Sequence, residues 1–216
     1  MNLKQDLTLN NYSKTKVGVS IVLISYCFFS FLLHWQALDF FYFNEWVARD
    51  FDMVFNLFEG VYIPLAGPEL DNGGRLPGPF LYLLMSIPLF VNKTFESIAH
   101  FNFLLNLAAV FIMFMTIRKY FGFYVASLFT ILLSIYLPHI NVFGYPINPS
   151  FLFPFIALYI WCILDLIINK NERAFPLVIL IVSLGIQLHY SMVTFYIAPL
   201  IFIFLYRIRI SPKYIF

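Results

Sequence analysis

The fold is decided by AFPLVILIVSLGIQLHYSMVTFYIAPLIFIFLY, residues Ala174–Tyr206, a stretch of 33 residues without one Asp, Glu, Lys or Arg. A helix needs about 20 apolar residues to cross roughly 30 Å of hydrocarbon, so this stretch is too long for one ordinary span and short for two. Arg173 and Arg207 flank it, and basic residues are retained on the cytoplasmic side of a membrane. We therefore predict a membrane hairpin that turns near His189–Ser191.

The composition of the whole chain agrees with a lipid environment. Of the 216 residues, 62% are hydrophobic and 11% are charged, whereas a soluble domain has about 45–50% apolar and about 25% charged residues. A cytosolic enzyme and a disordered chain are thereby excluded. The net charge of only +2, without a basic cluster, also argues against nucleic acid as a partner. Cys27 and Cys162 both lie in apolar runs, so neither a disulfide framework nor a zinc site is indicated.

The other apolar runs and the basic residues predict how the chain crosses the membrane. Ten of the thirteen Lys and Arg residues fall on one side if both termini are cytoplasmic. We therefore predict an all-α polytopic membrane protein with about six transmembrane helices, in which residues 1–216 form one transmembrane domain. The remaining predicted spans are Val17–Gln36, Ile98–Ile117, Phe121–Pro138 and Phe151–Ile168.

One apolar segment does not fit this count of spans. Gly78–Val91 has fourteen residues and contains Pro79 and Pro88. A run of this length is more often interfacial than transmembrane, and counting it as a span would place Arg118 and Lys119 outside. We predict an amphipathic helix that lies along the outer membrane surface.

The external loop, residues 37–97, is where we expect the chemistry. Its part from Asp39 to Arg75 holds seven of the eleven acids of the chain. Most of these acids are typical of a solvated loop. Glu45, Asp50 and Asp52 differ because they lie with Arg49 among aromatic residues just beyond a span, where a carboxylate tends to be kept for a partner or a task. They are the candidate catalytic acids, with a solvated loop as the alternative.

Two further groups of residues leave alternatives open. Gly73-Gly74-Arg75 would suit a phosphate, through backbone N–H groups and a guanidinium, but a simple turn has the same sequence. The four histidines all fall at outer ends of predicted spans, yet no pair has the i, i+4 spacing of a helix-borne metal site. The sequence therefore indicates no cofactor, and a divalent metal stays an unsupported alternative. The histidines are His34, His100, His139 and His189.

Several short motifs occur in a fixed order along the chain, and together they carry a resemblance. They are Ala48-Arg49-Asp50, Gly67-Pro68, Gly73-Gly74, Gly78-Pro79-Phe80, Ile147-Asn148-Pro149-Ser150 and Gly185-Ile186-Gln187-Leu188-His189-Tyr190. This order resembles the N-terminal half of bacterial glycosyltransferases of family 39, which have the GT-C fold and are related to protein O-mannosyltransferases and aminoarabinose transferases. The resemblance covers roughly residues 17–206.

The resemblance implies a site and a reaction. It implies transfer of a sugar from a polyprenyl-phosphate carrier to a lipid or protein acceptor at the outer face of a bacterial inner membrane. An acid in the first outer loop would be the general base, and Asp50 matches it, with Asp52 and Glu45 as neighbours. Arg49 and Arg75 are the candidates for the lipid phosphate, and His189 and Tyr190 for lining the cleft. We also expect the chain to correspond to the N-terminal part of a longer enzyme.

The rival interpretation is a non-catalytic membrane protein, such as a subunit of a transporter or flippase, or an inactive fragment. A transporter is expected to place ionisable residues at mid-membrane. The predicted spans carry Asn102, Asn106 and Gln187 as their main polar groups and Asp165 near one end. These polar groups are too few for an ion pathway, so the pattern favours chemistry in the outer loop.

Overall fold

The computed structural model describes residues 17–18, 21–26, 28–33, 35–36, 45–70, 73–135, 146–208 and 210–211. The described part of the predicted first span is helical. The elements that follow are α2 (Glu45–Phe58), β1 (Ala66–Glu69), β2 (Arg75–Pro77), α3 (Phe80–Ser86), the 3-10 helix η1 (Ile87–Phe90), α4 (Phe95–Phe121), α5 (Phe123–Ile135), η2 (Asn148–Leu152), α7 (Phe153–Ile168), α8 (Ala174–Leu188), η3 (Tyr190–Tyr196) and α9 (Ile197–Leu205).

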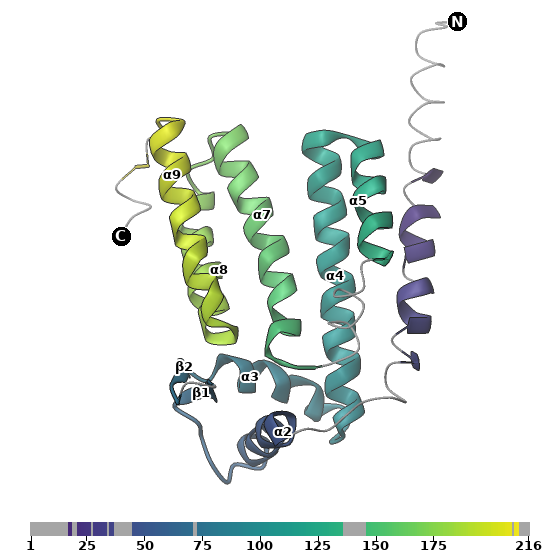
Figure 1. Cartoon of the computed structure of the whole chain (residues 1–216), viewed down its shortest axis with the longest axis vertical. Helices are drawn as coiled ribbons and strands as arrows, with labels where there is room; N and C mark the ends of the chain where they lie inside the picture. Colours follow the sequence, from purple (N-terminus) through teal and green to yellow (C-terminus); the bar gives the residue numbers. More distant parts are fainter. Residues whose placement is uncertain are drawn as a thin grey trace, which may run out of the picture.

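The described residues form a bundle with a cap at one end. Helices α4, α5, α7, α8 and α9 run side by side along the molecule, while α2, α3 and the β1–β2 hairpin lie across one end of them (Figure 1). Helix α7 packs between α4 and α8, and α5 packs on the other side of α4. The main core joins the cap to the bundle, because Leu81 and Met85 of α3 are buried in the same cluster as Val178 and Leu188 of α8.

Among the described residues, two helices are long and apolar enough to cross a membrane. Helix α4 has 27 residues, and η2 with α7 has 21. Thr94 caps α4 at its start by accepting a hydrogen bond from the Ser97 N–H, and Gly122, with φ of 90°, ends it. Arg118 and Lys119 lie in the last turn, where cations stabilise a helix end. The other bundle helices are apolar but shorter, so the predicted number of six spans stays a prediction.

The uncharged stretch folds as the predicted hairpin. Helix α8 ends at Leu188, and His189 is extended, with φ of −158°. The chain then turns back through η3, which packs on α8, and continues into α9, which contacts η3 and α7. The two arms are joined by the Ser183 and Tyr196 hydroxyls, 2.7 Å apart. The break falls within the segment where we predicted the turn.

The segment Gly78–Val91 lies across the bundle instead of along it (Figure 1). It forms α3 and η1, burying Leu81 and Met85 against the bundle while Leu83 and Phe90 stay exposed. This two-sided pattern is that of an amphipathic helix. Its placement at the outer membrane surface remains a prediction.

Two features differ from the sequence-based predictions. We predicted an all-α protein, but the structure also contains a short antiparallel hairpin, in which Ala66 pairs with Pro77 and Glu69 with Arg75. Glycines and prolines prevent a helix there, and we predicted no strand in its place. The third span was predicted to begin at Phe121, but that residue is the last of α4, and α5 begins after Gly122. Residues 136–138 of that predicted span lie outside the described residues.

Candidate functional site

A cleft of about 620 Å³ lies where the cap meets the bundle. Four segments far apart in the sequence line it, namely α2, the β1–β2 hairpin, the start of η2, and the turn between α8 and η3. Its lining residues are Trp46, Val47, Arg49, Asp50, Phe51, Glu69, Leu70, Leu76, Pro146, Ile147, Asn148, Pro149, His189 and Tyr190.

Glycine packing brings the hairpin onto the turn after α8. Gly78 has φ of +75°, and a Cβ at this position would lie 2.2 Å from Oε1 of Gln187. Only a glycine fits a backbone with this φ so close to a neighbouring side chain. Two of the motifs found in the sequence therefore meet here, and the contact places His189 and Tyr190 opposite α2.

Asn106 connects the bundle to the η2 wall of the cleft. This fully buried side chain on α4 donates from Nδ2 to the backbone oxygen of Ser150, at 3.2 Å, and to Oδ1 of Asn102, at 3.0 Å. Ser150 directly follows Asn148 and Pro149, which line the cleft. The two Asn side chains that sequence analysis noted within the spans thus hold α4 against the Asn-Pro turn.

Asp50 is the acid that the structure places in the cleft. Its Oδ1 accepts hydrogen bonds from Arg49 Nε at 3.0 Å and Nη2 at 2.8 Å, and a longer one from the Tyr82 hydroxyl at 3.4 Å. Its Oδ2 has no hydrogen-bond partner among the described residues, and it is not enclosed. Asp50 is 8% exposed. Burial raises the pKa of this carboxyl, and the Arg49 guanidinium opposes that rise.

Tyr82 is a partner of Asp50 that sequence analysis missed. It lies on α3, 32 residues after Asp50, and its side chain is buried. Burial and the negative charge of Asp50 both raise the pKa of Tyr82, so its hydroxyl stays protonated and donates to the carboxylate. Asp50 on α2 meets Tyr82 on α3 only because the two helices pack together. No local pattern in the sequence predicts that packing.

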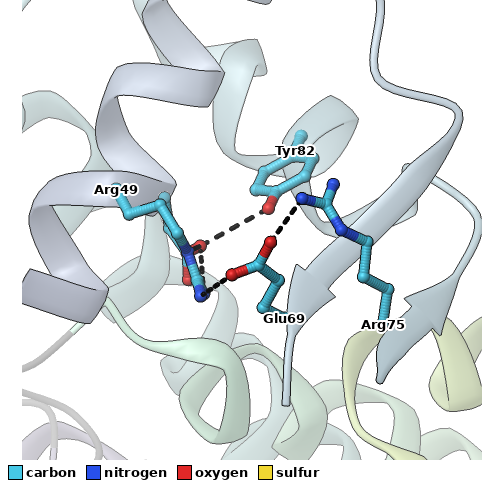
Figure 2. A network of polar contacts seen from close by, with 5 residues as sticks. Arg49, Glu69, Arg75 and Tyr82 are labelled. Atoms are coloured by element: carbon cyan, nitrogen blue, oxygen red, sulfur yellow. Dashed lines mark hydrogen bonds and ion pairs between the residues drawn. The ribbon is translucent and has the colours of Figure 1, made fainter. Parts of the chain in front are cut away.

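Glu69 links the two arginines of the site (Figure 2). Arg75 Nη2 donates to Oε1 of Glu69, and Arg49 Nη1 lies 3.7 Å from its Oε2. Arg49 Nη1 is buried and has no hydrogen-bond partner in the part of the chain that the structure describes, and the guanidinium lies over the Trp46 ring at 4.9 Å. We had interpreted Glu69 as a solvated acid, but the hairpin brings it to the cleft. Arg75 reaches Glu69 without lining the cleft.

The other two candidate acids do not line the cleft. Asp52 is exposed, and its Oδ2 accepts a hydrogen bond from Asn56 Nδ2 at 3.1 Å. Residues two apart on a helix do not share a face, which separates Asp52 from Asp50. Glu45 is exposed at the first position of α2. Of the three acids, the geometry brings only Asp50 together with Arg49, His189 and Tyr190.

His189 and Tyr190 form the opposite wall. Their rings stack with centroids 5.0 Å apart and planes at 19°. The Ser191 N–H donates to His189 Nδ1 at 3.3 Å, which places the proton of the neutral ring on Nε2. Burial lowers the pKa of His189, which favours this neutral form. Among the described residues, no three His, Cys, Asp or Glu side chains gather as metal ligands would. His34 and His139 lie outside those residues.

Gly73-Gly74-Arg75 forms a hairpin turn, which is the second of the two alternatives. The Gly73 N–H donates to the Leu70 oxygen at 2.9 Å, and the Leu70 N–H donates to the Gly74 oxygen at 2.7 Å. The Arg75 guanidinium pairs with Glu69. The Gly73 N–H is thus used within the hairpin instead of pointing toward a ligand.

Apolar helices of spanning length indicate an integral membrane protein, and the cleft lies at one end of its helical bundle. Residues 77–215 match the model of the dolichyl-phosphate-mannose-protein mannosyltransferases, and the chain belongs to this family. The match confirms the family resemblance found in the sequence. No curated protein and no solved structure matches the chain. The matched region includes η2, His189 and Tyr190, but it begins after Arg75, so the assignment of Asp50 depends on the geometry of the cleft.

Proposed function

We propose that the protein transfers a sugar from a polyprenyl-phosphate carrier to a lipid or protein acceptor at the outer face of a bacterial inner membrane. The observation that carries this proposal is the Asp50 carboxylate, which lines a cleft together with a guanidinium and the His189–Tyr190 wall. The family supports a lipid-linked sugar donor. The donor, the acceptor and the role of each residue belong to the proposal.

Asp50 acts as the general base in this reaction. The acceptor hydroxyl oxygen bonds to the anomeric carbon while the bond from that carbon to the phosphate oxygen breaks. The hydroxyl proton passes to Asp50, and the phosphate oxygen keeps the electron pair of the broken bond. Oδ2 suits this role because it has no partner among the described residues. A raised pKa also makes the carboxylate a stronger base than an ordinary aspartate.

Arg49 stabilises the departing phosphate. Its Nη1 carries N–H donors that find no hydrogen-bond partner among the described residues, in a buried position beside the cleft. A guanidinium suits phosphate oxygens because it offers several donors in a planar fork. Arg75 adds a second positive charge, balanced by Glu69 while no substrate is bound. The exposed ring of Tyr190, stacked on His189, offers an apolar face to the substrate.

The proposal requires the cleft to face outward. The site lies at the end of the bundle opposite Arg118 and Lys119, and the basic residues favour a cytoplasmic location for that other end. Both chain termini would then be cytoplasmic, and α3 would lie along the outer surface. In a background without Cys27 and Cys162, an impermeant thiol reagent should label Val61→Cys in intact cells and should not label Lys170→Cys. The reverse labelling pattern would overturn the orientation.

The base is tested by sugar transfer in proteoliposomes, with polyprenyl-phosphate sugars as donors and the full chain as the enzyme. Asp50→Asn keeps the size and polarity of the side chain but removes the base, which typically costs about 10²–10⁴ in rate. Asp52→Asn on the same helix is the matched control and should retain nearly the full rate. Loss of activity with Asp52→Asn or Glu45→Gln, and not with Asp50→Asn, would move the base. If all three variants transferred sugar at the rate of the parent protein, catalysis by this loop would be refuted.

A further inference from the structure

A second cavity, unrelated to the cleft, opens between α4 and α7. It has a volume of about 530 Å³, and its walls are almost entirely apolar. Phe111 and Met115 line it from α4, and Leu158 and Trp161 line it from α7. Phe111 is 51% exposed and Trp161 41% exposed, so the groove is open to the surroundings. In an integral membrane protein, such a surface is covered by lipid chains or by another protein.

A basic residue closes one end of this groove. Lys119 lines it four residues beyond Met115, on the same face of α4. Its ammonium group lies 3.3 Å from Oδ1 of Asp165, and its side chain is 52% exposed. The Lys119 side of the pair is exposed to solvent, whereas the Asp165 side chain is only 15% exposed, so solvent screens the pair in part and reduces the cost of separating it.

Asp165 does not need Lys119 as a partner. Its Oδ1 accepts hydrogen bonds from the Tyr120 hydroxyl at 2.9 Å and from Asn169 Nδ2 at 2.6 Å. Its Oδ2 accepts one from Asn171 Nδ2, also at 2.6 Å. Both carboxylate oxygens are therefore satisfied by neutral donors. The positive charge of Lys119 is available to a second anion at the mouth of the groove.

The surrounding charges favour an anion as well. Around this end of the bundle the described residues include five basic side chains and two acidic ones. The carboxylate of Glu172 is engaged, since Oε2 accepts a hydrogen bond from the Ser211 N–H at 2.8 Å. Basic pockets between transmembrane helices on the cytoplasmic side bind anionic lipid head groups. The charged residues are Arg118, Lys119, Lys170, Arg173 and Arg207, against Asp165 and Glu172.

We propose that this groove is a binding site for an anionic phospholipid of the inner leaflet. One acyl chain lies along Phe111, Met115 and Trp161, and the head-group phosphate pairs with Lys119 and with Arg118 beside it. The long Lys and Arg side chains reach the phosphate level while their stems stay on apolar surface. The site does not depend on the proposed transfer reaction, because it lies on the other half of α4, but its place in the inner leaflet rests on the orientation proposed above.

Trp161 allows a direct test, because it lines the groove. In the full chain with Trp35→Phe and Trp46→Phe, Trp161 is the one tryptophan left of the three. Its fluorescence is measured in vesicles that contain phosphatidylglycerol or phosphatidylcholine with brominated acyl chains, which quench on contact. We expect phosphatidylglycerol to bind about thirtyfold more tightly, since each of the two basic residues near the surface is worth about 1 kcal/mol, or about fivefold.

Two variants test the charge. Lys119→Gln should abolish most of the preference for phosphatidylglycerol, and Arg118→Gln should reduce it. Lys93→Gln, just before the other end of α4, is the matched control and should leave the preference unchanged. Equal quenching by the two lipids in the parent protein would overturn the proposal, because it would show ordinary boundary lipid. An absence of quenching by either lipid would overturn it too, because a protein surface would then cover the groove.

Discussion

The molecule has two aspartates with similar neighbours, one at each end of the bundle, and they are suited to different tasks. Asp50 and Asp165 each contact one basic side chain and one tyrosine hydroxyl. Asp165 also accepts hydrogen bonds from Asn169 and Asn171, so both of its oxygens have partners. Asp50 receives all its hydrogen bonds from described residues on Oδ1 and lies beside a cleft.

The difference shows that the number of partners, more than their type, separates a structural acid from a candidate base. A carboxylate offers about four acceptor sites on its two oxygens. Asp165 fills both oxygens with donors from α4 and from the turn after α7, so it joins two helices. Asp50 keeps one oxygen for a substrate, at the cost of burial that its single guanidinium partly offsets.

The first prediction has the largest expected effect. It concerns Arg49, the cation that contacts Asp50. Burial raises the pKa of Asp50 and Arg49 lowers it, so Arg49→Gln should raise it further. A base works only when it is deprotonated, so the acidic limb of the pH–rate profile should move to higher pH. At a fixed pH on that limb the rate should fall about tenfold or more, because an adjacent opposite charge shifts a carboxyl pKa by about one unit or more.

The matched change at the other end is Lys119→Gln. It removes the positive charge beside Asp165, while the three neutral donors to that carboxylate remain. The pH–rate profile of sugar transfer should stay unchanged. A profile that does not move in Arg49→Gln, or one that moves equally in both variants, would show that the two acids do not differ in the way described.

The second prediction compares two glycines with positive φ, one at each end of the bundle. Gly122 has φ of +90° and ψ of 171°, a backbone region essentially confined to glycine, with open space around it, so Gly122→Ala should cost only the backbone penalty of about 1–3 kcal/mol. Gly78 has φ of +75°, and a Cβ there would meet Gln187. Gly78→Ala should therefore cost about 1–3 kcal/mol more, as overpacked sites do. Thermal unfolding in detergent measures both. Equal losses of stability in the two variants would show that the Gln187 side chain moves aside without a measurable cost.

Much of the fold follows from the sequence because apolar runs and basic residues act along the chain. The break at His189 was predicted from the length of the uncharged stretch and its two flanking arginines. The end of α4 was missed because Gly122 lies inside a continuous apolar run, where a hydropathy pattern shows no boundary. The β1–β2 hairpin was missed because its strands have only four and three residues, too short for an alternating pattern.

The site was predicted in part, for a similar reason. Asp50, Arg49, His189 and Tyr190 belong to motifs, and the cleft brings these four together. Asp52 and Glu45 were equal candidates because sequence proximity does not tell which face of α2 meets the bundle. Glu69 and Tyr82 became recognisable only through contacts between the hairpin, α2 and α3, which depend on packing between segments far apart in the chain.

The third prediction tests whether Asp165 is structural. Asp165→Asn replaces an acceptor oxygen by an amide donor and leaves at least one of Asn169, Asn171 and Tyr120 without its partner. An unsatisfied donor costs about 1–3 kcal/mol, so the free energy of unfolding should fall by that amount, while sugar transfer per folded molecule stays unchanged. Asp50→Asn should show the opposite pattern, with lost activity and little change in stability. A variant at Asp165 that is stable but inactive would contradict the assignment of roles.

The smallest effect is expected for the hydrogen bond from Tyr82 to Asp50. At 3.4 Å it is longer than a typical O–H···O bond, and Arg49 already donates twice to the same oxygen. Tyr82→Phe keeps the ring that packs in the core and removes only the hydroxyl, so it should cost about 0.5–1.5 kcal/mol of stability. Because this hydrogen bond lowers the pKa of Asp50, its loss should also move the acidic limb of the pH–rate profile to higher pH, by less than Arg49→Gln does. Tyr159→Phe, which removes a buried hydroxyl bonded to the Phe195 oxygen away from the cleft, is the matched control. It should cost similar stability without moving the profile. If both variants move the profile alike, Tyr82 acts through general loosening of the fold and not through Asp50.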